Sequence, residues 1–487
     1  MISPRDKVRH AMRALSYCGL DAWTALAAGL LWLSVGAWHG VLGIVLAVPP
    51  GVLLTGAGCA RLLWRESRRV LRFVALGAAV GCILALPAAL VFSGTKVLGL
   101  LVISGAVFVA AGHASLRSDP PRRAVPEARR SLAMAARVAV DEVVLAGQDL
   151  VAAPPSASAL ERVHREVAAA RELFAQRGWL ADPSTYHRKP PSLEVVRLDT
   201  RRLRRGAGVI AYEALEFESG YAPEAAEPGQ IRWLGYAANR TAHAVILRHP
   251  GAPRPWLVCV HGYRMGHTGF GMWIFDATRQ HQRLGLNVAL PVLPLHGPRR
   301  AGRFSGEGFL GADVLDTIHA EAQAVWDLRR LLSWIRTQGA TTLGIHGVSL
   351  GGYTAALLAG IDADLSCVIA GIPPTDLASL VWHHAPPPSV RLIERSGLVY
   401  DEIAELHRVV SPLAISPKVP ARGRAIYAGI GDRLVPAGHP RDLWEHWDRP
   451  RIVWMQSGHD PRTPQARRLV EETLRSSLNW PPRSRAP

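Results

Sequence analysis

The sequence predicts an α/β fold, a mostly parallel sheet with helices on both faces, preceded by an α-helical transmembrane region of about four spans. Three observations support this prediction. Apolar residues crowd the first quarter of the chain. From Ala242 onward, short apolar stretches of strand length alternate with longer stretches of helical periodicity. Glycine-rich polar motifs follow the ends of those strands, at the edge where open α/β sheets carry their sites.

The chain has 487 residues, which indicates two or three units. We predict a transmembrane helical domain at 1–118, a helical linker at 119–191 and an α/β domain at 192–487, with a cap at 377–412. The net charge of +17 comes mostly from arginines that are scattered along the chain. They form no single stripe with aromatic residues between them, so we expect no nucleic acid as a partner. We expect a positive surface that lies against anionic membrane lipids. The five cysteines lie far apart in apolar runs, which favours small buried residues over a disulfide framework.

The predicted spans are apolar segments close to the roughly 20 residues that cross a bilayer as a helix. They run from about Leu20 to Trp38, Val41 to Ala60, Val70 to Phe92 and Val97 to Ala114. Arginine clusters precede the first span, join the second to the third and follow the fourth, whereas the other two turns hold a neutral tripeptide and Lys96. By the positive-inside rule, this pattern predicts an integral inner- or plasma-membrane protein with both termini and the α/β domain in the cytoplasm. A cleaved signal peptide, or fewer spans with a re-entrant hairpin, are the alternatives.

Helical spacing at 126–150 and 157–177 predicts the two helices of the linker. Three opening antiparallel strands are expected at 192–198, 209–217 and 242–247. The strands of the parallel part are expected at 256–260, 288–293, 343–346, 367–370, 424–428 and 451–454.

A G-x-S-x-G pentapeptide at 347–351 lies between the strand at 343–346 and a predicted helix at 352–358. Such a strand–turn–helix holds its central serine, here Ser349, in a strained conformation with the hydroxyl exposed at the helix N-terminus. That makes Ser349 the candidate nucleophile. The backbone N–H of Leu350 is one candidate oxyanion donor, and the N–H of Tyr263, in a His-Gly-Tyr turn after the strand at 256–260, is the other.

A serine nucleophile needs a base, and the base needs a group that orients it. The strand at 424–428 leads into a glycine-flanked Asp432, and the strand at 451–454 leads into His459 beside Gly458. We therefore predict Asp432 as the acid and His459 as the base. Asp376, after the strand at 367–370, is the alternative acid, and Asp460 is interpreted as a helix cap.

Two further pairs of side chains are candidates for binding a ligand. The pair Arg299-Arg300, at the mouth of the predicted site, has the chemistry to hold a phosphate or carboxylate, or else lies in a solvated turn. The pair His383-His384 has no carboxylate or cysteine at ligand spacing, so we expect neither a metal nor a cofactor.

With Ser349, Asp432, His459 and the turn at His261, the sequence resembles the α/β-hydrolase superfamily over about residues 242–478. The loop at 295–300 resembles the "type 18" branch of α/β-hydrolase-domain proteins, which is linked to lipid deacylation. The resemblance implies an esterase- or lipase-like serine hydrolase. The four spans are not part of the superfamily's general pattern.

Together with the spans, this resemblance leads us to expect hydrolysis of a lipid or lipophilic ester through an acyl-Ser349 intermediate. A peptidase, a thioesterase or an acyltransferase would use the same three residues. The rival from another class is a non-catalytic membrane scaffold that retains a hydrolase shell. Acyl chain, head group and oligomeric state stay open.

Overall fold

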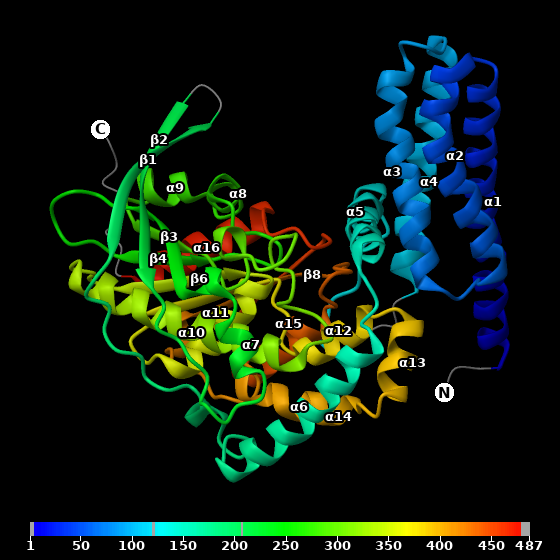
Figure 1. The fold of residues 1–487 in the computed structure, drawn as a ribbon. Coiled ribbons are helices and arrows are strands. Elements are labelled where there is room, and N and C mark those ends of the chain that lie inside the picture. Colours follow the sequence, from blue (N-terminus) through cyan, green and yellow to red (C-terminus); the bar gives the residue numbers. More distant parts are fainter. Residues whose placement is uncertain (1–3, 119–121, 206–207, 479–487) are drawn as a thin grey trace. The chain divides into compact units, whose positions relative to one another are not determined.

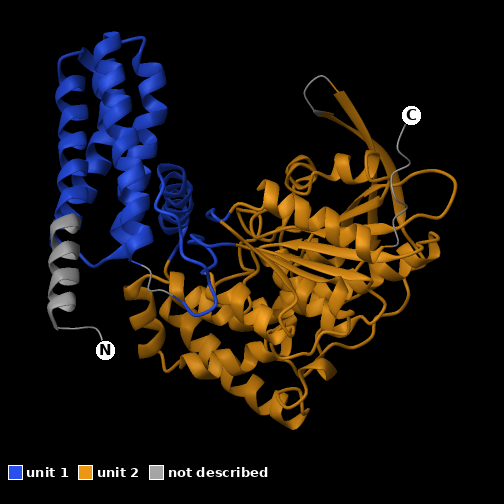
Figure 2. Cartoon of the chain, turned by 180° about the vertical axis from the view of Figure 1, so that it is seen from behind, with its two compact units in different colours: residues 1–153, 429–436, 456–459 blue, residues 154–428, 437–455, 460–487 orange. Residues whose placement is uncertain are grey.

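The computed structural model describes residues 4–118, 122–205 and 208–478, and it consists of two compact units. The first unit comprises Met1–Ala153 together with two short loops, Gly429–Pro436 and Gln456–His459. The second unit comprises the rest of the chain (Figure 2). The predicted linker at 119–191 is therefore divided, because its first helix belongs to the first unit and its second helix to the second.

The first unit is a bundle of five helices (Figure 1): α1 Pro4–Ala37, α2 Gly40–Leu63, α3 Arg68–Ala88, α4 Gly94–Arg117 and α5 Leu132–Val151. Helices α2, α3 and α4, and the part of α1 from Gly19, are each long and apolar enough to cross a membrane. Successive helices contact one another, and α5 contacts α3 and α4. Gly112 lets α5 approach α4, because a Cβ at that position would clash with the carbonyl oxygen of Ala135.

The second unit is built on a sheet of nine strands in the order β1-β2-β3-β5-β4-β6-β7-β8-β9. The strands are β1 Arg197–Arg205, β2 Gly208–Glu218, β3 Thr241–Leu247, β4 Trp256–Val260, β5 Asn287–Pro291, β6 Leu343–Val348, β7 Cys367–Gly371, β8 Arg424–Gly429 and β9 Arg451–Met455. Strands β1, β2 and β3 pair antiparallel, β3 pairs antiparallel with β5, and the pairs from β5 through β4, β6 and β7 to β8 are parallel.

The first strand differs from the prediction. It was expected at 192–198, but β1 spans Arg197–Arg205 and carries five arginines among its nine residues. Strand β1 is at the edge of the sheet, where it pairs with β2, and Leu203 is its one residue that packs, partly buried, against the apolar clusters of the described residues. Its sequence consequently lacks the hydrophobic alternation by which strands are recognised.

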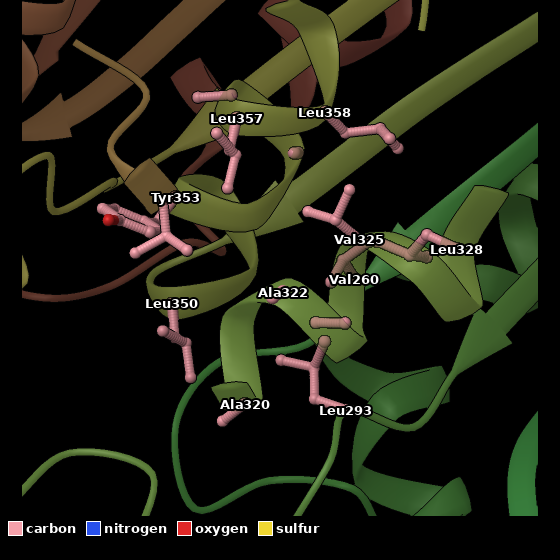
Figure 3. Close-up of a cluster of buried hydrophobic side chains, with 14 of the residues drawn as sticks. Val260, Leu293, Ala320, Ala322, Val325, Leu328, Leu350, Tyr353, Leu357 and Leu358 are labelled. Carbon is pink, nitrogen blue, oxygen red and sulfur yellow. The ribbon is translucent and has the colours of Figure 1, made fainter. Parts of the chain in front are cut away.

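Helices cover both faces of the sheet, as the residues of β4 show. Trp256, Val258 and Val260 point into one apolar cluster, and Leu257 and Cys259 point into another. The first cluster includes side chains of α10 Val314–Thr337 and α11 Leu350–Ile361, some of which Figure 3 shows around Val260. The second includes side chains of α8 Thr268–Ile274, α9 Ala277–Gln282 and α16 Pro464–Ser477.

Three helices lie between β7 and β8, where the cap was predicted: α12 Leu377–His384, α13 Pro387–Arg395 and α14 Tyr400–His407. Helix α14 contacts α6 Ala157–Gln176, and Arg171 of α6 pairs with Glu402 and Glu405 of α14. The remaining helices are α7 Gln230–Leu234 and α15 Gly438–His446, with short 3₁₀ turns at Pro183–Tyr186, Ala237–Arg240, Gly297–Arg299, Arg408–Val410 and Ala421–Gly423.

Candidate active site

Ser349 occupies a sharp turn between β6 and α11. Its backbone has φ 56° and ψ −120°, a conformation that a residue with a Cβ adopts only under strain. The surrounding backbone holds this conformation, because the N–H of Ser349 donates to the carbonyl of Gly371 at 2.8 Å. The Ser349 carbonyl accepts the N–H of Gly352, also at 2.8 Å. A strained serine between a strand and a helix is the arrangement of a nucleophile elbow.

The two glycines of the pentapeptide are required by close backbone passage. A Cβ at Gly347 would clash with the carbonyl oxygen of Gly351. A Cβ at Gly351 would in turn clash with the carbonyl oxygen of Val260, at the end of β4. The turn therefore closes tightly on itself and on the neighbouring strand, as the G-x-S-x-G pattern predicts.

The turn after β4 lies against the serine. A Cβ at Gly262 would be 3.2 Å from the Cβ of Ser349, so the backbone that leads to Tyr263 passes directly beside the candidate nucleophile. On the other side, Leu350 is the first residue of α11 and its N–H has no acceptor within the helix. These are the two predicted oxyanion donors, and the second unit contains both of them together with Ser349.

His261 holds the turn after β4 in place. Its Nε2 accepts the N–H of Leu293 at 3.1 Å, which leaves Nδ1 to donate to the carbonyl of Gly262 at 2.8 Å. Burial lowers the pKa of His261 to about 4, so the imidazole is neutral near pH 7. His261 is therefore a buried, neutral side chain that stabilises the loop through these two hydrogen bonds.

A buried carboxyl packs against α11, the helix that follows Ser349. Glu321 of α10 is 0% exposed, and its Oε2 accepts the hydroxyl of Thr354 of α11 at 3.1 Å. Its Oε1 has no hydrogen-bond partner among the described residues. Burial raises the pKa of Glu321 to about 8, so this carboxyl is largely protonated at pH 7.

We expect Glu321→Gln to change how stability depends on pH. Because the folded pKa lies above the unfolded value, the folded chain binds more protons between about pH 4.5 and 8, and wild-type stability falls as pH rises through that window. The variant should unfold near the wild-type temperature at pH 5 and well above it at pH 8.5, because a folded pKa of about 8 in place of about 4.5 corresponds to roughly 4 kcal/mol across that window. Thermal unfolding in detergent at both pH values measures this. If E172Q, an exposed control, showed the same pH-dependent gain, the interpretation would be wrong.

The predicted acid and base are hydrogen-bonded to each other. Nδ1 of His459 lies 2.7 Å from Oδ2 of Asp432, and Oδ1 of Asp432 accepts the N–H of Val435 at 2.8 Å. Because a carboxylate only accepts, Nδ1 of His459 carries the proton and Nε2 is left as the basic nitrogen. Asp432 is buried, with 4% of its surface exposed.

The other two aspartates that the sequence singled out have local roles. Asp376, the alternative acid, is the N-cap of α12 and accepts the N–H of Ser379 at 2.9 Å. Asp460 was expected to cap a helix, but it accepts the N–H of Arg462 in a turn, and Thr463 is the N-cap of α16. The structure therefore brings Asp432, and not Asp376, to His459.

One further residue beside the acid and base, Asp141, was not among the candidates that the sequence offers. Asp141 of α5 accepts the backbone N–H groups of Arg433 and His459, and it is 5% exposed. Burial, followed by the negative charge of Asp432, raises the pKa of Asp141 to about 8. An acidic residue between the apolar positions of an amphipathic helix is ordinarily interpreted as part of its solvated face, so the sequence carries no local signal of this burial.

The prediction that Arg299 binds an anionic substrate is wrong. Its side chain is 0% exposed and its guanidinium pairs with Asp327 at 2.8 Å. The same guanidinium donates to the carbonyls of Val292 and Asn239. Arg299 thus links the loop after β5 to α10. A buried guanidinium requires a counter-charge and hydrogen-bond acceptors, and Asp327 and the two carbonyls supply them. Arg300 is exposed.

Breaking this buried pair should be costly. We expect Arg299→Met to lower the free energy of unfolding by about 3–5 kcal/mol, because it leaves the Asp327 carboxylate buried without its partner. The matched variant Arg300→Met changes an exposed side chain and should stay within about 0.5 kcal/mol of wild type. Urea unfolding in detergent compares the two, and equal midpoints would show that the Arg299–Asp327 pair does not stabilise the fold.

The pair His383-His384 lies at the end of α12. The two rings lie 4.9 Å apart. Across the described parts of the chain, no group of three His, Cys, Asp or Glu side chains is arranged to hold a metal ion.

The mostly parallel sheet, its flanking helices and the strained serine turn fit an α/β-hydrolase fold. No family model matches the sequence. The uncharacterized protein MT2702 of Mycobacterium tuberculosis strain CDC 1551 / Oshkosh is 44% identical over 360 residues, which cover 72% of this chain and 84% of that protein. The uncharacterized protein Rv2627c of strain H37Rv is 43% identical, with the same coverage. The chain belongs to the family of these two mycobacterial proteins.

Two acetyl xylan esterases of known structure align with more than half of this chain. The acetyl xylan esterase from Paenibacillus sp. R4 aligns with 61% of this chain and 99% of its own, at 14% identity and a TM-score of 0.44. Acetyl xylan esterase 1 from Thermoanaerobacterium sp. JW/SL YS485 aligns with 64% of this chain and 92% of its own, at 13% identity and a TM-score of 0.40.

Proposed function

We propose that this protein is a membrane-anchored serine hydrolase that cleaves a lipid or lipophilic ester. The observation that carries the proposal is the strained Ser349 at the carboxyl end of β6, with the backbone before Tyr263 beside it. The Asp432–His459 hydrogen bond supports it. Ser349 follows β6 and Asp432 follows β8, and both strands are parallel to β7 between them, so their carboxyl ends share one edge of the sheet.

The proposed first step is acylation. The hydroxyl oxygen of Ser349 attacks the ester carbonyl carbon while Nε2 of His459 takes the hydroxyl proton. The N–H groups of Leu350 and Tyr263 stabilise the negative charge that develops on the carbonyl oxygen. The ester C–O bond then breaks, the leaving alkoxide receives the proton from His459, and the acyl group stays on Ser349. Asp432 stabilises the imidazolium through its hydrogen bond to Nδ1.

The second step returns the enzyme to its starting state. A water molecule gives a proton to Nε2 of His459 and attacks the acyl carbon, and the bond to Ser349 breaks as the serine oxygen regains that proton. The products are an alcohol and a carboxylic acid. No residue of this scheme requires a metal or an organic cofactor.

The substrate class follows from the first unit. Four helices long and apolar enough to cross a membrane would place the α/β unit at a lipid surface, on the cytoplasmic side by the arginine distribution. An ester dissolved in or attached to that membrane is then the most accessible substrate. Arg300 is exposed and remains the candidate contact for an anionic head group. Helices α12 to α14 are the proposed cap, and membership of the "type 18" branch stays a prediction.

Labelling of the full chain in membranes with a fluorophosphonate probe tests the proposal. An activated serine reacts with the probe, and mass spectrometry should find the adduct on the peptide that contains Ser349. A folded protein that stays unlabelled would instead favour the non-catalytic scaffold. Hydrolysis of a vesicle-embedded ester faster than of a short soluble one would support the lipid class, and the reverse would favour a soluble ester as the substrate.

A further inference from the structure

The two loops that carry the proposed acid and base belong to the same compact unit as the apolar helices. Residues 429–436, with Asp432, and 456–459, with His459, group with helices α1 to α5. Strands β8 and β9, which lead into these loops, belong mostly to the other unit. The residues that hold the loops within the first unit therefore decide how the acid–base pair is placed.

Asp141 makes the central contact to both loops. Its Oδ2 accepts the N–H of Arg433 at 3.0 Å and the N–H of His459 at 2.9 Å, and its Oδ1 lies 3.1 Å from the same His459 N–H. One carboxyl of α5 thus binds the backbone of the base itself and of the residue next to the acid. The two backbone donors are satisfied by Asp141 in a buried setting where water is scarce.

The glycines beside the acid and base are where α5 packs. A Cβ at Gly458 would lie 2.6 Å from Oδ2 of Asp141, which is too close for any larger residue. A Cβ at Gly431 would lie 2.5 Å from the Cε of Met134 and 2.9 Å from the Cγ2 of Val138, both on α5. These two glycines therefore let the loops lie directly on the helix.

Other contacts join the same loops to the helices. The N–H of Gly431 donates to the carbonyl of Ser457 at 3.0 Å and links the two loops to each other. The guanidinium of Arg433 donates to the carbonyl of Ser115 at 2.8 Å, near the end of α4. The side chain of Gln456 accepts the N–H of Arg129 at 2.8 Å, just before α5. Each loop is thus bound at more than one point to the helical unit.

We infer that Asp141 is a positioning residue, which holds the backbone of the acid and base loops so that His459 and Asp432 keep their mutual hydrogen bond. The inference rests on the proposed function. It makes α5 part of the catalytic apparatus, together with α4, which is also one of the four proposed membrane spans. Burial and the charge of Asp432 favour protonation of Asp141, so a neutral amide in its place keeps much of the local electrostatics.

The test is the time course of fluorophosphonate labelling of the full chain in detergent, with variants Asp141→Asn and Asp141→Ala. The final extent of labelling reports the fraction of correctly folded protein, and the rate constant reports how well the acid–base pair is placed. We expect full final labelling with a rate about 10-fold lower for D141N, and about 100-fold lower for D141A, which removes both acceptor oxygens.

Asp149→Asn is the matched control. Asp149 is on the same helix and pairs with Arg69 at 2.7 Å and Arg72 at 2.9 Å, both of which are on α3 and outside the two loops. D149N should label at the wild-type rate. If D141N and D141A reached a lower final extent at the wild-type rate, Asp141 would be merely structural and the inference overturned. Wild-type rates in all variants would overturn it as well. Failure of the wild-type chain to label would instead overturn the proposed function.

Discussion

Ser349→Ala is expected to lower kcat/KM for a p-nitrophenyl ester by about 10⁴- to 10⁶-fold, and His459→Ala by a similar factor. Without the serine oxygen, no acyl intermediate forms. Without the imidazole, the hydroxyl keeps its proton and is a poor nucleophile. The residual rate would come from substrate binding and from the oxyanion donors at Leu350 and Tyr263.

The double variant S349A/H459A separates this mechanism from two independent defects. Residues that act as one unit have non-additive effects, so the double variant should be no slower than the slower single variant. Kinetics of the purified full chain in detergent, with unfolding temperatures measured for every variant, provide the comparison. Turnover by folded S349A within about tenfold of wild type would exclude an acyl-Ser349 mechanism.

Asp432→Asn is expected to reduce kcat by about 10⁴-fold while leaving KM and folding nearly unchanged. An amide at this position can donate a hydrogen bond to Nδ1 of His459. This stabilises the tautomer whose proton is on Nε2, and in that tautomer Nε2 cannot accept the proton of the Ser349 hydroxyl. The backbone contact from Val435 to Oδ1 can persist in the variant, so the loop should keep its conformation. Steady-state kinetics of the full chain measure the loss.

Asp376→Asn is the control for this prediction, because the sequence offered Asp376 as the other acid. Asp376 caps α12, and an asparagine caps a helix about as well as an aspartate. D376N should therefore keep kcat within about twofold of wild type. The opposite result, a large loss in D376N and little in D432N, would reassign the acid in spite of the 2.7 Å contact between Asp432 and His459.

Much of the fold was predictable because its signals are local. The four apolar helices lie on the four predicted apolar segments, and the strands from β4 to β9 lie within a few residues of their predicted positions. Buried strands and long apolar helices each impose their own periodicity on the sequence. The edge strand β1 was misplaced for the same reason, since a strand held by backbone pairing to β2 imposes no such pattern.

The candidate site was predictable in part. Ser349 was found because the nucleophile turn, the strand before it and the helix after it are contiguous in sequence. The sequence could not decide between Asp432 and Asp376, because both follow a strand. Only the three-dimensional path of the loops shows which of the two reaches His459. Arg299 was misassigned, because an arginine beside a proline in a loop looks the same whether it faces solvent or a buried Asp327.

By itself, then, the sequence determined the class of fold, the apolar helices and the identity of the candidate nucleophile, since each depends on residues that are neighbours along the chain. Only the tertiary structure decided which aspartate meets His459, that Arg299 is buried, and that Asp141 binds the two loops. Those contacts join residues separated by 27, 28 and about 300 positions. A hydrogen bond between such distant residues depends on where the folded backbone brings them, and local periodicity carries no record of it.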